Sequence, residues 1–193
     1  VAQIPSGLVV NPAVPANSVA DLVALAKKQP GKLHYGSGGS GTTLHLSGEM
    51  MNAMAGVEVM HVPYKGAGPA LNDLLGGRVD MLFDNLPGSL PSVKAGLIRP
   101  IAVTSKTRIP ELPDVPAMAE FLPGYAMTSW TIMIGPAGVS AGTVERTNAL
   151  VRQALADEAV KKRYAELGAS VWPTTPDEAK AFREEEEKRL LPI

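Results

Sequence analysis

The sequence has no cysteine and no long apolar run, and each absence excludes a class of protein. Without cysteine, the 193-residue chain can form no disulfide and no Cys-based zinc or iron–sulfur site. No segment approaches the roughly 20 apolar residues of a membrane-spanning helix. The first residues, Val1 to Pro5, also lack the charged and apolar regions of a signal peptide. We therefore expect a soluble chain from which any leader has been removed.

An excess of charge of one sign is also missing. Lys and Arg number 18 against 19 Asp and Glu, and no block rich in Lys or Arg occurs. A non-specific nucleic-acid binder needs such a block to displace counterions from phosphates, so we expect no nucleic-acid partner. The chain does contain 45% apolar residues, which suits one or two globular lobes, and 19 glycines and 17 prolines, which indicate many turns and loops.

Short apolar runs alternate with segments of helical periodicity through the first half of the chain. This alternation predicts βαβ units, a mostly parallel sheet covered by helices on both faces, and an α/β fold. The expected strands are 8–10, 33–35, 57–62, 79–83 and 98–104, and the expected helices are 19–26, 44–54, 67–75 and 88–94.

A proline-rich segment, 105–125, then precedes the apolar run 130–134, and we expect a domain boundary there. The remainder is predicted to be mainly helical. The expected elements are helices at 143–155 and 157–167, a strand near 169–172 and a helix from Pro176.

The most distinctive local feature is the glycine-rich loop 36–41, which lies between a predicted strand and a predicted helix. Its spacing satisfies G-x-G-x-x-G, so a dinucleotide site has to be considered. Such a site needs an acidic residue about 20 positions further on, at the end of a strand. Here that residue is Glu58, which falls inside a predicted strand, so the dinucleotide interpretation is weak.

An anion site fits the same loop better. Glycines let backbone N–H groups turn toward a ligand, and a helix N-terminus adds unpaired donors and positive partial charge. Hydroxyl groups are plentiful and the P-loop lysine is absent, so a carboxylate is a more natural guest than a triphosphate. The hydroxyls belong to Ser37, Ser40, Thr42 and Thr43. The alternative is a glycine-rich turn that satisfies only its own hydrogen bonds.

Further polar residues follow the next two predicted strands. Tyr64 and Lys65 come after one, and Asp84 and Asn85 end the other, so they should reach the edge of the sheet where ligands bind in open parallel folds. Lys65 can offset an anionic ligand, Asp84 can accept a hydrogen bond from an ammonium or hydroxyl group, and Asn85 can do either. Each of these residues taken alone can equally be a loop-capping group.

Metal and hydrolase chemistry find little support. His45 and Glu49 stand four residues apart and His61 is a conceivable third ligand, but no H-E-x-x-H pattern occurs, so hydrogen-bonded histidines near the loop are the default. The residues around Ser37 lack the first glycine of a G-x-S-x-G elbow.

Several segments, in this order and spacing, resemble the tripartite tricarboxylate transporter receptor family. The segments are YGSGGSGTTLHL (35–46), HVPYKG (61–66), DLLGG (73–77), MLFDN (81–85), AVTS (102–105), LPDVP (112–116), LPGY (122–125) and GPAG (135–138). The likeness spans nearly the whole chain. It implies a periplasmic solute-binding protein of the Bug type, with a type II periplasmic-binding-protein fold of two α/β lobes that close over a small carboxylate and deliver it to a membrane permease.

The resemblance also implies a site, by position in the motifs. It places an anion loop after the second predicted strand, two residues at the rim of a cleft and two toward a hinge. The implied ligand-binding residues are Ser37, Gly38, Gly39, Gly41, Thr42, Tyr64, Lys65, Asp84 and Asn85. It implies no catalytic residues, no cofactor and no metal. Gly38 stands where the family commonly has serine, and Leu44 where it often has a polar residue, which removes a donor.

Relative to the family, the chain begins partway through the first lobe. We expect a complete second lobe at 11–127, with 1–10 and 128–193 forming the crossing segments and the remaining part of the first lobe. A sheet without some of its strands exposes unpaired edges and apolar surface. We therefore expect this form to self-associate, with exchange of the segment 128–193 as one route, and to bind carboxylate more weakly than an intact receptor.

Two other functions compete with the receptor interpretation. A ligand-sensing effector domain of a transcription regulator shares the two-lobed architecture, but it should have a helix-turn-helix nearby, and none precedes Val1. An enzyme built on the anion site needs a nucleophile or a base, and the sequence offers no such pair.

Overall fold

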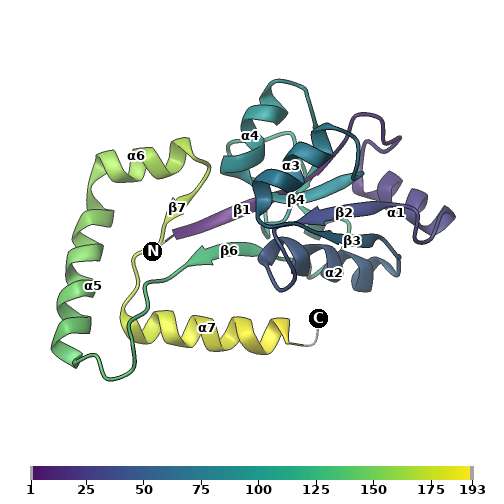
Figure 1. Ribbon diagram of the computed structural model, residues 1–193. Coiled ribbons are helices and arrows are strands. Elements are labelled where there is room, and N and C mark those ends of the chain that lie inside the picture. Colours follow the sequence, from purple (N-terminus) through teal and green to yellow (C-terminus); the bar gives the residue numbers. More distant parts are fainter. Residues whose placement is uncertain (1, 192–193) are drawn as a thin grey trace. The chain divides into compact units, whose positions relative to one another are not determined.

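The computed structural model describes residues 2–191, which divide into two compact units (Figure 1). The sheet unit comprises residues 5–129, and the helical unit comprises residues 2–4 and 130–191. The chain passes between them inside strand β1 (Ala2–Val10) and strand β6 (Thr128–Thr131). The lobe expected at 11–127 lies inside the sheet unit, which also takes in 5–10 and 128–129.

The sheet has the strand order β3-β2-β4-β1-β5. The strands β2 (His34–Ser37), β3 (Met60–Pro63) and β4 (Met81–Asn85) form the expected parallel part. Strand β1 is antiparallel to β4 and to β5 (Arg99–Val103), with Ser6 opposite Asn85. The sheet is therefore mixed and not mostly parallel as expected, because β1 lies between β4 and β5 and runs antiparallel to both.

Helices cover both faces of this sheet, as the alternating pattern predicted. They are α1 (Val19–Lys28), α2 (Thr43–Ala55), α3 (Ala67–Leu75) and α4 (Leu86–Lys94). The α3 bounds match the predicted range. Ala70 and Leu74 of α3 pack with Leu82 on one face. Tyr35, the neighbour of Gly36 in β2, points to the opposite face, where its ring meets Gly48 of α2.

Gly48 allows α2 to lie directly on the sheet. A Cβ atom at this position would overlap the ring of Tyr35, which is fully buried. The absence of a side chain at Gly48 therefore brings α2, and the loop before it, close to the strand ends.

The proline-rich segment 105–125 packs on the sheet unit instead of separating two units. Val103 donates its N–H to the carbonyl of Pro116 over 2.8 Å, and Ile109 and Val115 join a core cluster with Leu86. A short 3-10 helix, Met118–Glu120, follows. The apolar residues of this segment pack in the core of the sheet unit. The chain therefore leaves the sheet unit only at β6.

The helical unit contains α5 (Ala141–Ala156), α6 (Glu158–Glu166), the short strand β7 (Ser170–Val171) and α7 (Pro176–Leu190). Strand β7 pairs with the first residues of β1. The rings of Trp130 and Trp172 meet Phe182 edge to face at 5.6 and 4.5 Å between centroids. Within residues 2–191, no helix is long and apolar enough to span a bilayer.

Candidate functional site

Three polar segments follow the three parallel strands and share one edge of the sheet. The loop 38–42 follows β2, residues 64–66 follow β3, and Asn85 ends β4 (Figure 1). The first two segments are hydrogen-bonded together: Tyr64 donates its N–H to the Ser37 carbonyl over 3.0 Å, and Gly66 donates to the Gly38 carbonyl over 3.2 Å. Parallel pairing thus assembles the predicted site at the carboxyl ends of the strands.

Much of the loop's own polarity is used to hold its shape. The buried Ser37 hydroxyl accepts the Gly39 N–H over 3.1 Å, and the Thr42 hydroxyl donates to the Gly39 carbonyl over 2.7 Å. Gly39 and Gly41 have φ values of 126° and 79°, which favour glycine. Ser37, Gly39 and Thr42 therefore define the conformation of the loop, and the two hydroxyls point inward.

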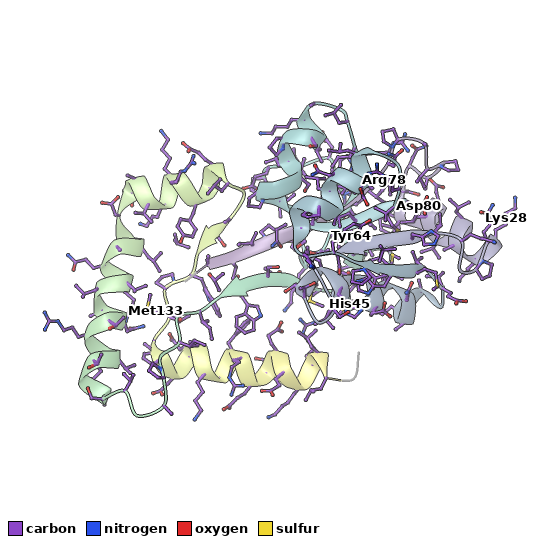
Figure 2. The ribbon with its side chains drawn as sticks, in the orientation of Figure 1. Lys28, His45, Tyr64, Arg78, Asp80 and Met133 are labelled. Carbon is purple, nitrogen blue, oxygen red and sulfur yellow. The ribbon has the colours of Figure 1, made fainter. Side chains whose placement is uncertain are left out.

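Two histidines form hydrogen bonds with this loop. The Ser37 hydroxyl lies 2.6 Å from His61 Nε2, and Gly41 donates its N–H to His45 Nδ1 over 3.2 Å. The His45 and His61 ring centroids are 4.1 Å apart, and Tyr35 stacks on His61. Figure 2 shows His45 near the start of α2. Burial, and then the adjacent His45, lower the pKa of His61, so the ring is neutral at pH 7.

From the sequence, these histidines were candidate metal ligands or, by default, hydrogen-bonded residues near the loop. Among residues 2–191 no group of three or more His, Asp or Glu side chains is arranged to hold a metal ion. His45 Nε2 is 3.9 Å from Glu49 Oε1, and Tyr35 donates its hydroxyl to the same carboxylate over 2.5 Å. The contact of His61 with Ser37, 24 positions apart, has no signal in the sequence beyond the presence of both residues in family motifs.

The unoccupied donors of the loop belong to its outer residues. Within the part of the chain that the structure describes, the N–H groups of Ser40, Thr43 and Leu44 make no hydrogen bond, nor do the hydroxyls of Ser40 and Thr43. Thr43 and Leu44 form the first turn of α2, where the helix dipole concentrates positive partial charge. These donors suit a negatively charged ligand. The sequence predicted the hydroxyls of Ser40 and Thr43 as donors of an anion loop, but the residues implied by the family resemblance included neither of them, and Leu44 was expected to remove a donor.

Of the two residues that follow β3, Tyr64 has a hydrogen-bonded side chain and Lys65 has a free one among residues 2–191. Tyr64 donates its hydroxyl to Asp73 over 2.8 Å, and Arg78 binds the other oxygen of that carboxylate over 2.7 Å. Burial raises the pKa of Tyr64, so its hydroxyl remains a donor. Lys65 is exposed and, within residues 2–191, forms no ion pair. The ammonium group of Lys65 is therefore available beside the loop.

Asp84 and Asn85 have contrasting environments at the end of β4. Asp84 is only 1% exposed, and within residues 2–191 no group reaches hydrogen-bonding geometry at either carboxylate oxygen. Burial raises its pKa to about 6, although the nearby Asn85 N–H and Ser89 hydroxyl partly offset that effect. Asn85 is half-buried, and its Oδ1 accepts the hydroxyls of Ser6 at 2.9 Å and Ser129 at 2.8 Å.

The geometry does not favour a dinucleotide. Glu58, the acidic residue that such a site requires, precedes β3, and its carbonyl accepts the N–H of Gly31 over 3.0 Å. Gly31 precedes β2, so Glu58 lies at the opposite ends of these strands from the glycine loop. A ribose held by the loop would not meet it.

Comparisons with known proteins agree on one family. A family model described as "Tripartite tricarboxylate transporter family receptor" matches residues 1–193. A protein from Pseudomonas sp. (strain P51), described by its place in the tcbD-tcbE intergenic region, is 38% identical over 194 residues, which cover 97% of this chain and 56% of the relative. The chain thus spans a little over half of that relative's length.

Solved structures extend the likeness to the fold. One, titled as R. palustris Rpa4515 with adipate, is 39% identical, with a TM-score of 0.92 over 98% of this chain and 64% of the other. Another, titled as MatC from Rhodopseudomonas palustris with bound malate, is 27% identical, with a TM-score of 0.88 over 97% of this chain and 65% of the other. The expected α/β fold of the periplasmic-binding-protein type is confirmed.

Proposed function

Because the chain belongs to the tripartite tricarboxylate transporter receptor family, we propose that it captures a small dicarboxylate at the sheet edge formed by the loop 38–42. Proteins of this family are periplasmic solute-binding proteins and not enzymes. The observation that carries the proposal is the set of donors of Ser40, Thr43 and Leu44 at the positive end of α2, which have no partner among residues 2–191. Two of the solved relatives are titled with dicarboxylates, adipate and malate.

The proposed ligand contacts divide between a first and a second carboxylate. One carboxylate accepts the N–H groups of α2's first turn and the hydroxyls of Ser40 and Thr43, as anions do at helix N-termini. The Lys65 ammonium, which is exposed beside the loop and unpaired within residues 2–191, offsets the charge of the second. The other predicted residues of the loop act mainly by fixing its shape, with Ser37 and Thr42 holding Gly39.

The first experiment tests the loop by calorimetry with adipate and malate. Gly39→Val forces a β-branched residue onto a φ of 126° and should weaken binding at least about tenfold. Gly56→Val provides the control, because Gly56 also has a positive φ, 60°, but caps the other end of α2. Unchanged affinity in a folded Gly39→Val protein would remove the loop from the site.

The second experiment tests the role of Lys65. Lys65→Met should weaken adipate binding by about fivefold to tenfold and hexanoate binding much less, because only the dicarboxylate has a second charge to neutralise. Lys28→Met is the control, since Lys28 lies in the last turn of α1. Equal losses for both ligands would assign Lys65 a structural role, and unchanged affinities would make it a solvated side chain.

We further propose that the chain works in the periplasm and presents its ligand to the membrane permease subunits of a tripartite transporter. The family description supports this partnership. Co-purification of the chain with permease subunits in the presence of adipate tests it. Equal recovery with and without adipate would argue against ligand-dependent delivery.

A further inference from the structure

We propose that Ser6 and Ser129 are positioning residues that hold the Asn85 carboxamide so that its NH2 group donates to the bound carboxylate. In this arrangement the Asn85 side chain is hydrogen-bonded to β1 and to β6, the two strands along which the chain passes between its units. The inference rests on the proposed dicarboxylate function and adds two residues that neither the sequence motifs nor the loop geometry singled out.

The Oδ1 end of the Asn85 carboxamide is saturated with hydrogen bonds. The Ser6 and Ser129 hydroxyls both donate to Asn85 Oδ1, over 2.9 and 2.8 Å, and so use both lone pairs of that oxygen. Within residues 2–191 the Asn85 NH2 group has no hydrogen-bond partner. Asn85 precedes α4 as its N-cap residue, but its side chain makes no capping hydrogen bond. Its two N–H donors are therefore available.

The NH2 donors of Asn85 lie on the sheet face that α2 covers. Side chains alternate along β4. Leu82 packs with α3, and Asp84 lies against Gly88 of α4, where a Cβ would come within 2.8 Å of Asp84 Oδ2. Phe83 packs against Tyr35 on the α2 face, and Asn85 has the same parity as Phe83. The Asn85 carboxamide thus shares a sheet face and a sheet edge with the first turn of α2.

The Asn85 carboxamide is held by a buried hydrogen-bond network around Ser6. Ser6 is fully buried and lies opposite Asn85 in the β1/β4 ladder. Its N–H donates to the Thr104 hydroxyl over 3.2 Å, and that hydroxyl donates in turn to the Met127 carbonyl over 2.6 Å. This buried network joins β1 to the segment leading into β6, independently of the hydrogen bonds to Asn85. The Oδ1 of Asn85 consequently has two fixed donors, and rotation of the amide would break both bonds.

The two serines lie where the chain passes from the sheet unit to the helical unit. Ser6 is the second residue of the sheet unit along β1, and Ser129 is its last residue along β6. A ligand that binds the NH2 group polarises the carboxamide and strengthens the two bonds to Oδ1. Ligand binding should therefore stabilise the backbone of β1 and β6 at these points.

The experiment measures adipate affinity and the Asn85 side-chain amide signal in 15N-labelled protein. We expect Ser129→Ala to weaken adipate about fivefold to tenfold, Ser129→Thr to restore affinity to within about twofold, and Ser105→Ala to have no effect. Ser105 is a suitable control because its hydroxyl bonds only locally, to the Thr107 carbonyl. The Asn85 NH2 resonances, identified by their loss in Asn85→Asp, should shift on adding adipate.

A positioning role also predicts non-additive losses. If Ser129 acts through Asn85, adding Ser129→Ala to Asn85→Ala should cause little further loss of adipate affinity. Independent losses in the double variant, or wild-type affinity in Ser129→Ala, would overturn the positioning role while leaving dicarboxylate binding intact. Failure of the wild-type chain to bind either adipate or malate would overturn the proposed function and this inference together.

Discussion

The sheet unit and the helical unit differ sharply in how they bury apolar side chains. The sheet unit packs apolar residues on both faces of its sheet, with fully buried side chains such as Tyr35, Leu74 and Phe83. Among the described residues of the helical unit, the buried apolar side chains are Ala2 and Leu155. The helical unit instead exposes Met133 at 64% and Ile134 at 83% (Figure 2).

The helical unit contains an open apolar cavity. Helices α5 and α7 of the helical unit line an apolar cavity of about 290 Å³ together with Ile132 and Trp172, so apolar surface that could form a core remains open. The sheet unit has a closed core and also carries all the proposed site residues. The site is thus supported by a scaffold that buries its own core, whereas the helical unit needs further contacts to bury its apolar face.

We expect the largest loss of stability from a substitution that disrupts the closed core of the sheet unit. Gly48→Ala would drive a Cβ into the Tyr35 ring, and we expect a loss of more than about 3 kcal/mol in the free energy of unfolding. Urea denaturation followed by circular dichroism measures it. Gly142→Ala in α5 of the helical unit is the control, because its Cβ would meet nothing within 4 Å, and it should be neutral or stabilising by up to about 1 kcal/mol. Equal effects would show that the two units are packed alike.

A smaller effect is expected from the buried carboxyl group of Asp84. Burial raises its pKa from 3.8 to about 6, so the folded chain keeps the proton in a pH range where the unfolded chain has released it. Stability is therefore lost as the pH rises from about 4 to 6. Asp84→Asn should remove this loss and raise the free energy of unfolding by up to about 3 kcal/mol at pH 7, with no gain near pH 3.5.

Denaturation of wild type and variant across this pH range tests the expectation. The exposed Asp114→Asn serves as the control and should leave the pH dependence as it is. A gain from Asp84→Asn that is the same at pH 3.5 and pH 7 would mean that the charge of Asp84 is not its cause.

The smallest expected effect concerns self-association through the helical unit. We expect the 193-residue chain to associate at micromolar concentrations, because the exposed Met133, Ile134 and Leu150 offer apolar surface. Light scattering should show Leu150→Glu, at a position 59% exposed, weakening association about tenfold. Leu97→Glu, at a position 56% exposed in the sheet unit, should not. A stable monomer at high concentration, or equal effects of both variants, would contradict this assignment.

Local features of the site were predictable from the sequence because they depend on neighbours in the chain. The bounds of α3 and the glycine loop between β2 and α2 follow from hydrophobic periodicity, capping residues and glycine spacing. The sequence also placed Lys65 and Asn85 after strands that share one sheet edge. These patterns sufficed for the fold class and for the position of the candidate site.

The roles of individual side chains depended on contacts between distant segments. Ser37 pairs with His61, which is 24 positions away, and Asn85 bonds Ser6 and Ser129, which are 79 and 44 positions away. No local pattern encodes such pairs. The Ser37 contact exists only once β2 has paired with β3, and the Asn85 contacts exist only once β1 has entered the sheet between β4 and β5. Local residue patterns thus specify which segments form the loop and the strand ends. Which polar groups hold these segments and which remain free for a ligand depends on the folded arrangement, because the partner of a hydrogen-bond donor is known only once folding has brought the two together.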